Sequence, residues 1–440
     1  MTAAVEQDLA GMPRHARYRS RQHAAVRTED YTYSQLIPYI GNKRKLLPLI
    51  ARGIAAAGCA GGVFVDLFTG STVVARFAKT LGFQMVANDW EPYAYEIARG
   101  TVAINRVPAF EALGGAKRVF DVLNTLPPVH GYIAQHLCPA DDEHPNHLLE
   151  RMFFTRQNGE RIDAIREQIA AWEAEGTISD DECAYLLSAL VYSVSYVSNT
   201  SGVFKGFHNG WGGKTSTALY RIRSTMRLAS PVVYDNGQQN IALREDAQIL
   251  ARHLSDVVGK QPSIVYLDPP YNQHPYGSNY HVLNTVALWD KPKLHPHIVV
   301  NGRPHDKSAI RKDWRTERRS SYNTVREALP CFRSLVSSLD ARWILTSYST
   351  DGNMPLEGLL KALAERGSLQ VFTQRYKRYR VSTPRMSPKP HNIEFLAVLD
   401  TQGKPCVGRV DELAESIWRE EEISLSATQR SAEQLSLFTY

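Results

Sequence analysis

The most informative short segment is Asp268-Pro269-Pro270-Tyr271, at the end of an apolar strand predicted over residues 264–268. Ligands of open α/β sheets bind at the carboxyl ends of such strands. The two prolines stiffen the chain and lack N–H donors, so the Asp268 carboxylate and the Pro269 carbonyl remain as acceptors facing one small volume. Two such acceptors suit an NH2 group, and the Tyr271 ring offers a face to a planar base. The segment therefore predicts a site for the exocyclic amino group of a flipped nucleobase.

A second chemical signal lies at residues 66–71 (DLFTGS), between an apolar run and a helical pattern. Thr72 stands where the GxGxxG of dinucleotide-binding proteins has its second glycine, which argues against a pyrophosphate cradle. Asp66 at a strand tip suits a cationic amino group, and Asp89 at the end of the next predicted strand suits ribose hydroxyls. An amino acid joined to a nucleoside without phosphate describes S-adenosylmethionine. Any Rossmann-type crossover has a similar turn, so both interpretations stay open.

These residues require a parallel sheet to bring them together. Apolar runs bounded by turn residues predict strands at 63–68, 85–89, 264–268, 343–347 and 393–399. Helical patterns at 74–81 and 92–105 alternate with the first of these strands, which is typical of a doubly wound α/β fold. The apolar spacing between residues 148 and 200 is helical throughout and indicates an insertion into that fold.

The chain is therefore expected to have four parts. They are a mobile N-terminal arm at 1–33, a catalytic domain at 34–109 and 236–401, a helical insert for target recognition at 110–235, and a helix with a flexible tail at 402–440.

The composition is that of a globular protein with a modest basic excess. The formal net charge is +6 and the pI is about 8.9, which permits a polyanionic partner. The five cysteines are scattered without CxxC spacing, so neither a disulfide framework nor a zinc site is expected. No apolar run is long enough to span a membrane, and the N-terminus lacks the apolar core of a signal peptide. A cytoplasmic protein is expected.

Three segments in this order resemble the D12 class of DNA adenine N6-methyltransferases: residues 38–43 (PYIGNK), 68–71 (FTGS) and 268–271 (DPPY). The stretch at 272–281 also resembles one branch of that class, and the likeness covers residues 34 to 400. The resemblance implies a Rossmann-like sheet of seven mostly parallel strands that binds S-adenosylmethionine, with an insert that reads duplex DNA. It also implies methyl transfer to the amino group of a flipped adenine, without a metal.

The resemblance assigns roles to particular residues. Its catalytic residues are Asp268, Pro269, Pro270 and Tyr271. Its cofactor-binding residues are Tyr39, Gly41 and Lys43 from the N-terminal segment, Asp66, Phe68 and Gly70 at the methionine end, Asp89 at the ribose and Asp246 at the cofactor adenine. Asp246 is equally well read as a solvated loop acid, and Thr72 departs from the family's tighter first turn.

Other functions are kept as alternatives. Cytosine N4 methylation makes the same demand of an amino group, although serine is commoner than aspartate before the two prolines there. An amino target in RNA is a related alternative. A DNA-binding regulator that has lost catalysis is the alternative of a different class, and the intact Asp268 and Tyr271 argue against it.

Basic segments are predicted to hold the DNA backbone. The candidates are Lys205 and Lys214 in a glycine-rich loop, Arg303, Arg311, Arg315 and Arg318 in a polar stretch, and Arg375, Lys377, Arg378 and Arg380 in an acid-free stretch. A charge run of this kind is also typical of a solvated surface.

The C-terminal pentapeptide Gln434-Leu435-Ser436-Leu437-Phe438 resembles the peptide by which bacterial DNA enzymes dock on the replication sliding clamp. A tail folded back on its own core is the alternative. The expected partners are thus double-stranded DNA, the sliding clamp and a cognate restriction endonuclease.

Overall fold

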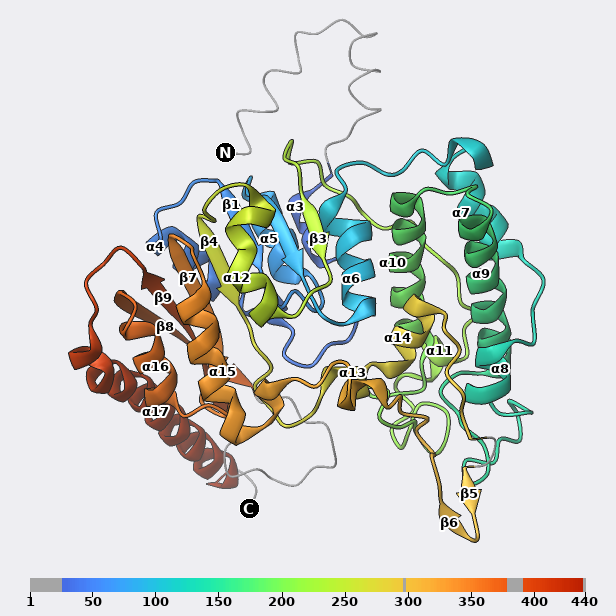
Figure 1. Cartoon of the computed structure of the whole chain (residues 1–440). Coiled ribbons are helices and arrows are strands. Elements are labelled where there is room, and N and C mark those ends of the chain that lie inside the picture. The colour runs from blue at the N-terminus through green and yellow to red at the C-terminus, as the bar shows by residue number, and fades with distance from the viewer. Residues whose placement is uncertain (1–25, 296–297, 378–390, 438–440) are drawn as a thin grey trace, which may run out of the picture.

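The computed structural model describes residues 26–295, 298–377 and 391–437, and its centre is a seven-stranded sheet (Figure 1). The strands are β1 (Val63–Asp66), β2 (Gln84–Asn88), β3 (Ile241–Leu243), β4 (Ile264–Leu267), β7 (Trp343–Ser349), β8 (Ser368–Lys377) and β9 (His391–Asp400). Their order is β3-β2-β1-β4-β7-β9-β8, and only β9 runs antiparallel to its neighbours β7 and β8. The predicted Rossmann-like α/β sheet of mostly parallel strands is confirmed.

Helices cover both faces of the sheet because successive side chains of each strand alternate between two cores. Phe64 packs with α4 (Leu47–Ala56) and α5 (Val73–Thr80). Val65, one residue later, packs on the opposite face with α12 (Ala247–Val258), α15 (Val325–Ser338), α16 (Leu356–Ala364) and α17 (Val410–Leu437). The strands are thus buried on both faces, which leaves their carboxyl ends as the edge where polar side chains gather.

A second lobe, shown beside the sheet in Figure 1, is helical. It contains α7 (Ala116–Thr125), α8 (Tyr132–Leu137), α9 (Arg156–Ala174), α10 (Asp180–Val197) and α11 (Leu219–Ile222). The same core takes in α6 (Pro92–Ala98) and α14 (His281–Leu288). The π-helical turn Arg99–Ala103 follows α6, and its Val102 packs in the sheet core that contains Phe64. Helix α13 (Tyr276–Asn279) and the projecting hairpin of β5 (Val299–Val300) and β6 (Arg303–Pro304) lie beside the helical lobe. The insert predicted at 110–235 therefore shares its core with residues on either side of it.

The predicted N-terminal arm is too long by several residues. Thr28–Tyr33 forms helix α3, and the fully buried Tyr31 donates a hydrogen bond to the Thr101 carbonyl at 2.9 Å. The Tyr31 ring also stacks on Tyr234, 5.5 Å away. Residues 28–33 therefore belong to the folded domain, whereas residues 1–25 lie outside the described part.

Two strands of the seven-stranded sheet were not predicted from the sequence. β3 is only three residues long and half-buried, so its apolar run is too short to indicate a strand. β8 is a strand of ten residues at the edge of the sheet, and it includes Gln374 and Arg375, which the sequence reading assigned to a basic segment. The alternation of polar and apolar residues in this segment is typical of an edge strand, but its basic residues led to its interpretation as a DNA-binding stretch.

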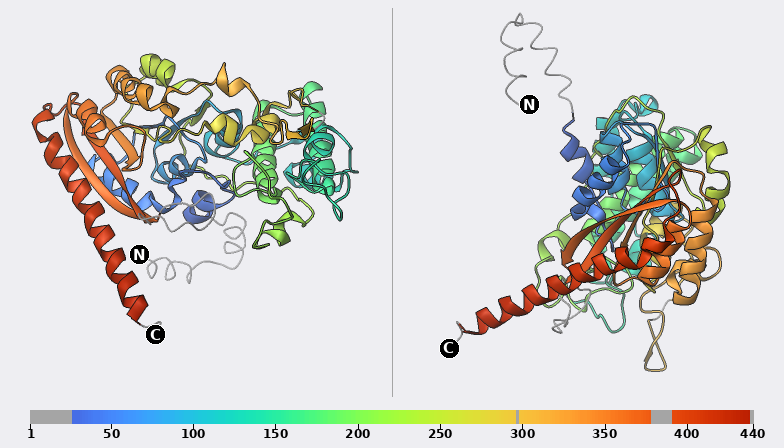
Figure 2. Two further views of the ribbon diagram at one scale, coloured as in Figure 1. Left: turned by 90° about the horizontal axis from the view of Figure 1, so that it is seen from below. Right: turned by 90° about the vertical axis from the view of Figure 1, so that its left-hand side faces the viewer.

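The C-terminal helix is longer than the expected span of Val410 to Glu421. α17 continues to Leu437, and its later turns extend away from the body of the molecule in both views of Figure 2. Gln434 and Leu435 therefore lie in a helix and not in a flexible tail, while Phe438 falls outside the described residues.

Candidate active site

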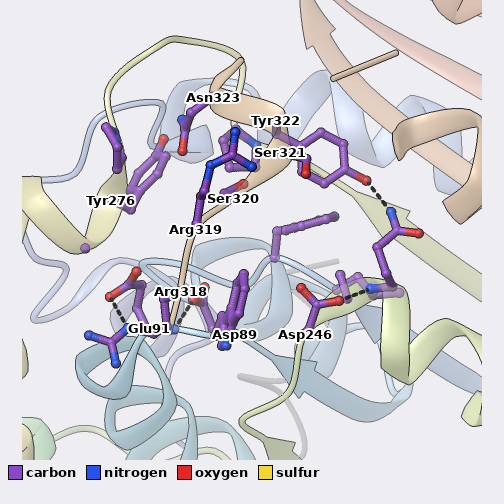
Figure 3. Close-up of a pocket in the computed structure, with 18 of the residues that line it drawn as sticks. Asp89, Glu91, Asp246, Tyr276, Arg318, Arg319, Ser320, Ser321, Tyr322 and Asn323 are labelled. Atoms are coloured by element: carbon purple, nitrogen blue, oxygen red, sulfur yellow. Dashed lines mark hydrogen bonds and ion pairs between the residues drawn. The ribbon is translucent and has the colours of Figure 1, made fainter. Parts of the chain in front are cut away.

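Three acidic residues lie together at the carboxyl edge of the sheet. Asp66 ends β1, Asp89 follows β2 and Asp268 follows β4, and these three strands are neighbours in the order β2-β1-β4. A pocket opens at this edge, and Figure 3 shows part of its lining. Its walls include Tyr39, Phe68, Asp89, Asp246, Asp268 and Tyr322. Of the predicted catalytic and cofactor residues, those that line this cavity are Tyr39, Phe68, Asp89, Asp246, Asp268 and Pro270. Those that are not part of its lining are Gly41, Lys43, Asp66, Gly70, Pro269 and Tyr271.

Asp268 is held by a buried lysine. The Lys43 ammonium lies 3.0 Å from Oδ1 of Asp268 and 3.7 Å from Oε2 of Glu394 in β9. Burial raises the pKa of Asp268, and Lys43 opposes that shift. Burial alone would lower the pKa of Lys43, but Asp268 and Glu394 together hold it above its usual value. The side chain of Asp268 keeps 17% of its surface exposed, so an acceptor faces the cavity.

The N-terminal segment packs directly on the DPPY turn. Gly41 has φ +77°, and a Cβ atom there would stand 2.6 Å from the hydroxyl of Tyr271. The ammonium of Lys43 lies 5.2 Å from the centroid of the Tyr271 ring, which is cation–π range. Packing against the DPPY turn thus leaves no room for a side chain at position 41, and it places the Lys43 ammonium over the Tyr271 ring.

A stack of tyrosines forms the wall between the two lobes. The ring of Tyr39 stacks on Tyr276 at 5.2 Å and on Tyr280 at 5.1 Å. The Tyr280 hydroxyl accepts from the Ile40 N–H at 2.8 Å, and the Tyr276 hydroxyl donates to the Ile40 carbonyl at 3.0 Å. Burial raises the pKa of Tyr39 well above its usual value, so its hydroxyl stays protonated.

The first turn has the polar contacts of a ligand cradle. One oxygen of Asp66 accepts from the Thr69 hydroxyl at 3.1 Å, while Oδ1 is buried without a hydrogen-bond partner. Burial, reinforced by Asp268, raises the pKa of Asp66 to about 8. Asp89 accepts the Gly70 N–H at 2.8 Å, and burial raises its pKa to about 6. Asp89 lines the pocket and is placed to accept from a hydroxylated ligand, whereas Asp66 is buried beneath the turn with one oxygen unpartnered.

Thr72 adopts a left-handed backbone with φ +66°, at the N-terminus of α5. This is the conformation that a glycine would take without strain, and a β-branched residue there is costly. The sequence reading noticed the departure from glycine, and the backbone explains why glycine is the expected residue.

Phe68, Tyr322 and Asp246 line a further part of the pocket. Phe68 meets Tyr322 edge to face, with ring centroids 5.6 Å apart. Asp246 caps α12 by accepting the N–H groups of Gln248 at 2.8 Å and Ile249 at 3.2 Å. Its carboxylate therefore has a structural role that the sequence reading did not weigh, although it also lines the pocket.

Two arginines predicted to bind DNA are buried in an ion network, which corrects that expectation. The side chain of Arg311 is 8% exposed and contacts Asp290 at 2.6 Å and Asp313 at 2.8 Å. Arg318 is 4% exposed and lies 2.6 Å from Asp313 and 3.7 Å from Glu91. Figure 3 shows Arg318 beside Glu91 at the pocket wall. These guanidinium groups are held by carboxylates and keep little surface for contact with phosphate.

The segment around Arg318 also supplies pocket residues that the sequence reading missed. They are Arg319, Ser320, Ser321, Tyr322 and Asn323, labelled in Figure 3 together with Glu91, a further missed residue that follows β2. Burial raises the pKa of Glu91 to about 7, against the opposing effect of Arg318. Only the unusual length of the polar stretch between two strands signalled that it does more than connect them.

The other predicted DNA residues lie apart from that network. Lys214, Arg303, Arg315 and Arg375 are exposed. Lys205 is partly buried, and its ammonium lies 3.4 Å from Nδ1 of His274, just beyond the DPPY turn. Lys377 ends β8, while Arg378 and Arg380 fall outside the described residues. Their contact with DNA remains a prediction.

Within the described ranges, no cluster of three or more His, Cys, Asp or Glu side chains could hold a metal ion. No helix in that part of the chain is both long and apolar enough to cross a membrane.

Comparison with known families gives a match over most of the chain. The model of the D12 class N6 adenine-specific DNA methyltransferase family matches residues 39–338. The matched range contains the predicted catalytic residues and every predicted cofactor residue, and it ends before β7.

Individual relatives agree with that family match. The type II methyltransferase M.NlaIII of Neisseria lactamica is 30% identical over 82% of this chain and 98% of its own length. The modification methylase StsI of Streptococcus sanguinis is 29% identical over 78% of this chain, and the type II methyltransferase M.FokI of Planomicrobium okeanokoites is 29% identical over 76%. The chain spans 48% of each of these last two proteins. No solved structure matches it.

Proposed function

We propose, since this chain belongs to the D12 class of N6 adenine-specific DNA methyltransferases, that Asp268 and Pro269 are the groups that activate the adenine amino group. The protein is a site-specific DNA adenine methyltransferase of the restriction–modification type. The observation that carries the proposal is the partly exposed Asp268 carboxylate, which lines the pocket at the end of β4 and is followed directly by Pro269. Among the described residues, no donor occupies the Pro269 carbonyl.

The family implies S-adenosylmethionine as methyl donor, and the residues fit it. The buried, unpartnered Oδ1 of Asp66 suits the ammonium of the methionine end, and Asp89 suits the ribose hydroxyls. Phe68 and Tyr322 would enclose the adenine of the cofactor, with Asp246 at its edge. When bound, this cofactor supplies an electrophilic methyl group on a sulfonium.

The chain's own groups prepare the nitrogen that receives this methyl group. Hydrogen bonds from the adenine NH2 to Asp268 and the Pro269 carbonyl favour a pyramidal nitrogen with a localised lone pair. The carboxylate then stabilises the positive charge that develops on the nitrogen. Because the N–H becomes acidic only after transfer, no strong general base is needed. The Tyr271 ring would stack on the flipped base.

The type of base is decided by nucleoside analysis. Duplex DNA methylated with labelled S-adenosylmethionine is digested, and the label is expected in N6-methyladenine. Label in N4-methylcytosine would favour the cytosine alternative, and absence of transfer by the wild type would favour the regulator. RNA offered as substrate tests the remaining alternative.

Cofactor binding is expected to release a proton near pH 7. Asp66 has a pKa of about 8 in the free protein, so it carries a proton at pH 7 and must lose it to face an ammonium. Affinity should therefore rise between pH 6 and pH 7.5, by at most about tenfold per pH unit. Calorimetry in buffers of different ionisation enthalpy counts the released protons, and Asp66→Asn should lower the count by about one. An unchanged count would exclude Asp66.

DNA affinity is expected to depend on the loop that carries Lys205 and Lys214. Each phosphate contact removed by alanine should weaken binding at every sequence and reduce the slope of log Kd against log salt by about 1. Lys117→Ala is the matched control, because Lys117 on α7 has a side chain 92% exposed. Slopes equal to that of the control would place DNA elsewhere.

The C-terminal peptide is proposed to dock on the sliding clamp. The restriction–modification role also leads us to propose a cognate endonuclease as a partner and a location at the nucleoid. Docking as an extended peptide requires the last turns of α17 to unwind. Truncation after Ser431 should leave methylation of short duplexes intact and abolish capture by the clamp. Ser436→Ala is the matched control that should still be captured. Failure of the full chain to bind the clamp would contradict this role.

A further inference from the structure

A buried lysine is shared by two buried carboxylates next to the DPPY turn. The side chains of Lys43 and Glu394 are 3% and 5% exposed, and the lysine ammonium lies within 4 Å of both Glu394 and Asp268. Glu394 sits in β9, which pairs with β7, while Asp268 follows β4 on the other side of β7. Asn392 holds the second oxygen of Glu394 at 3.4 Å and donates to the Ser349 hydroxyl at 2.6 Å. Only Asp268 of the three faces the pocket.

We propose that Glu394 is a positioning residue for methyl transfer, which acts by competing with Asp268 for the charge and the hydrogens of Lys43. This inference rests on the proposed role of Asp268. Nothing in the family resemblance pointed to Glu394, because the resemblance places Lys43 in the cofactor site.

The charge balance explains the need for a second carboxylate. An ammonium paired with Asp268 alone would neutralise that carboxylate and weaken its attraction for a nitrogen that becomes positive. With Glu394 ionised as well, the group of three keeps a net charge of −1 around one cation. Lys43 occupies Oδ1 of Asp268, so the other oxygen remains to accept from the substrate. Loss of Glu394 is therefore expected to pull Lys43 fully onto Asp268.

Other titratable groups face this cluster and must be included in any pH analysis. They are Asp66 on β1, Tyr266 on β4, Tyr271 and Tyr276 after β4, Tyr348 on β7, Asp351 after β7 and Tyr376 on β8. Burial raises the pKa of each of these five tyrosines, so they stay neutral at working pH. Lys43 is the cation that the structure places against both carboxylates.

Steady-state kinetics at saturating DNA and cofactor test the proposal. Glu394→Gln should lower kcat by about 10-fold to 100-fold, as for other groups that orient an active-site ligand, with little change in the KM for DNA. Its acid limb should move to lower pH, because Asp268 loses a neighbouring negative charge and gains the full effect of Lys43. Glu394→Asp should restore part of kcat and return the acid limb toward that of the wild type.

Asp163→Asn provides the matched control for a buried carboxylate. Asp163 is fully buried on α9 and accepts the N–H groups of Ile133 and Ala134, each at 2.8 Å. Its loss should lower stability without moving the acid limb. A Glu394→Gln enzyme with the wild-type acid limb and kcat would overturn the proposal, as would one that loses only stability.

A double-mutant cycle separates the charge balance from mere packing. Without Lys43 there is no ammonium for Glu394 to compete for, so Glu394→Gln should cost much less in a Lys43→Met background than in the wild type. An equal fold-loss in both backgrounds would show that the two residues act independently, and the proposal would fail.

A readout without cofactor or DNA is available from the free protein. Glutamate labelled with carbon-13 at the side-chain carboxyl gives one NMR signal that disappears in Glu394→Gln, which assigns Glu394. That signal should titrate at higher pH in Lys43→Met, because the ammonium that favours the carboxylate is gone. Identical titration curves would contradict the sharing of Lys43. If wild-type protein methylates no adenine, the proposed function fails instead, whatever the NMR titration shows.

Discussion

Replacement of Asp268 by alanine is expected to lower kcat by about 10³-fold or more, while DNA and cofactor still bind. The expectation follows from the loss of a preorganised group aimed at the charge that develops on the reacting nitrogen. The substitution also leaves the Lys43 ammonium, 3.0 Å away in the wild type, beside the reacting centre. Single-turnover methylation of a short duplex, with the enzyme in excess over DNA, measures this step without interference from product release.

Asp268→Asn provides the graded comparison. Asparagine keeps one carbonyl acceptor but no charge, so its rate should lie between those of the wild type and the alanine variant. Binding of DNA and cofactor, measured separately, should change by far less than kcat. A variant Asp268→Ala that retains more than about a tenth of the wild-type rate would remove Asp268 from the mechanism.

Replacement of Arg318 by alanine is expected to lower the free energy of unfolding by about 3–5 kcal/mol, because it leaves the buried Glu91 without its cation and Asp313 with Arg311 alone. Arg318 lies 2.6 Å from Asp313 and 3.7 Å from Glu91, whose side chains are 12% and 9% exposed. The pKa of Glu91, already about 7, should rise further. Because Arg318 also lines the pocket, cofactor affinity should fall in the folded fraction. Urea unfolding and calorimetry measure these two effects.

Arg315→Ala is the matched control for that experiment. Arg315 lies three residues away in the same basic stretch and is exposed, so its removal should change stability by less than about 0.5 kcal/mol. If Arg318→Ala were as stable as this control and lost DNA affinity selectively, Arg318 would contact DNA after all.

These two arginines show where the sequence alone stops being informative. A run of basic residues does not indicate which of them form ion pairs with carboxylates from elsewhere in the chain. Arg318 pairs with Glu91, which follows β2 and is far away in sequence. The catalytic turn could be predicted because its chemistry is local: strand, acid and two prolines are contiguous at 264–271. The same holds for the turn at 66–71.

The rest of the site depends on long-range pairing. Glu394 reaches Lys43 because β9 enters the sheet antiparallel beside β7, and no local pattern specifies that placement. Tyr322 contacts Phe68 at the pocket wall, but it belongs to a segment whose sequence has no regular periodicity. Helix α17 continues to Leu437 through a polar stretch that the sequence analysis assigned to a flexible tail.

The central claim is that two oxygens at the end of β4 hold the amino group that receives the methyl group. The most direct measurement is a crystal structure of the full chain with duplex DNA and a non-reactive cofactor analogue. The account predicts the target adenine outside the duplex, with its N6 at about 3 Å from both Asp268 and the Pro269 carbonyl. An adenine seated elsewhere, or an N6 contacted by neither oxygen, would contradict it.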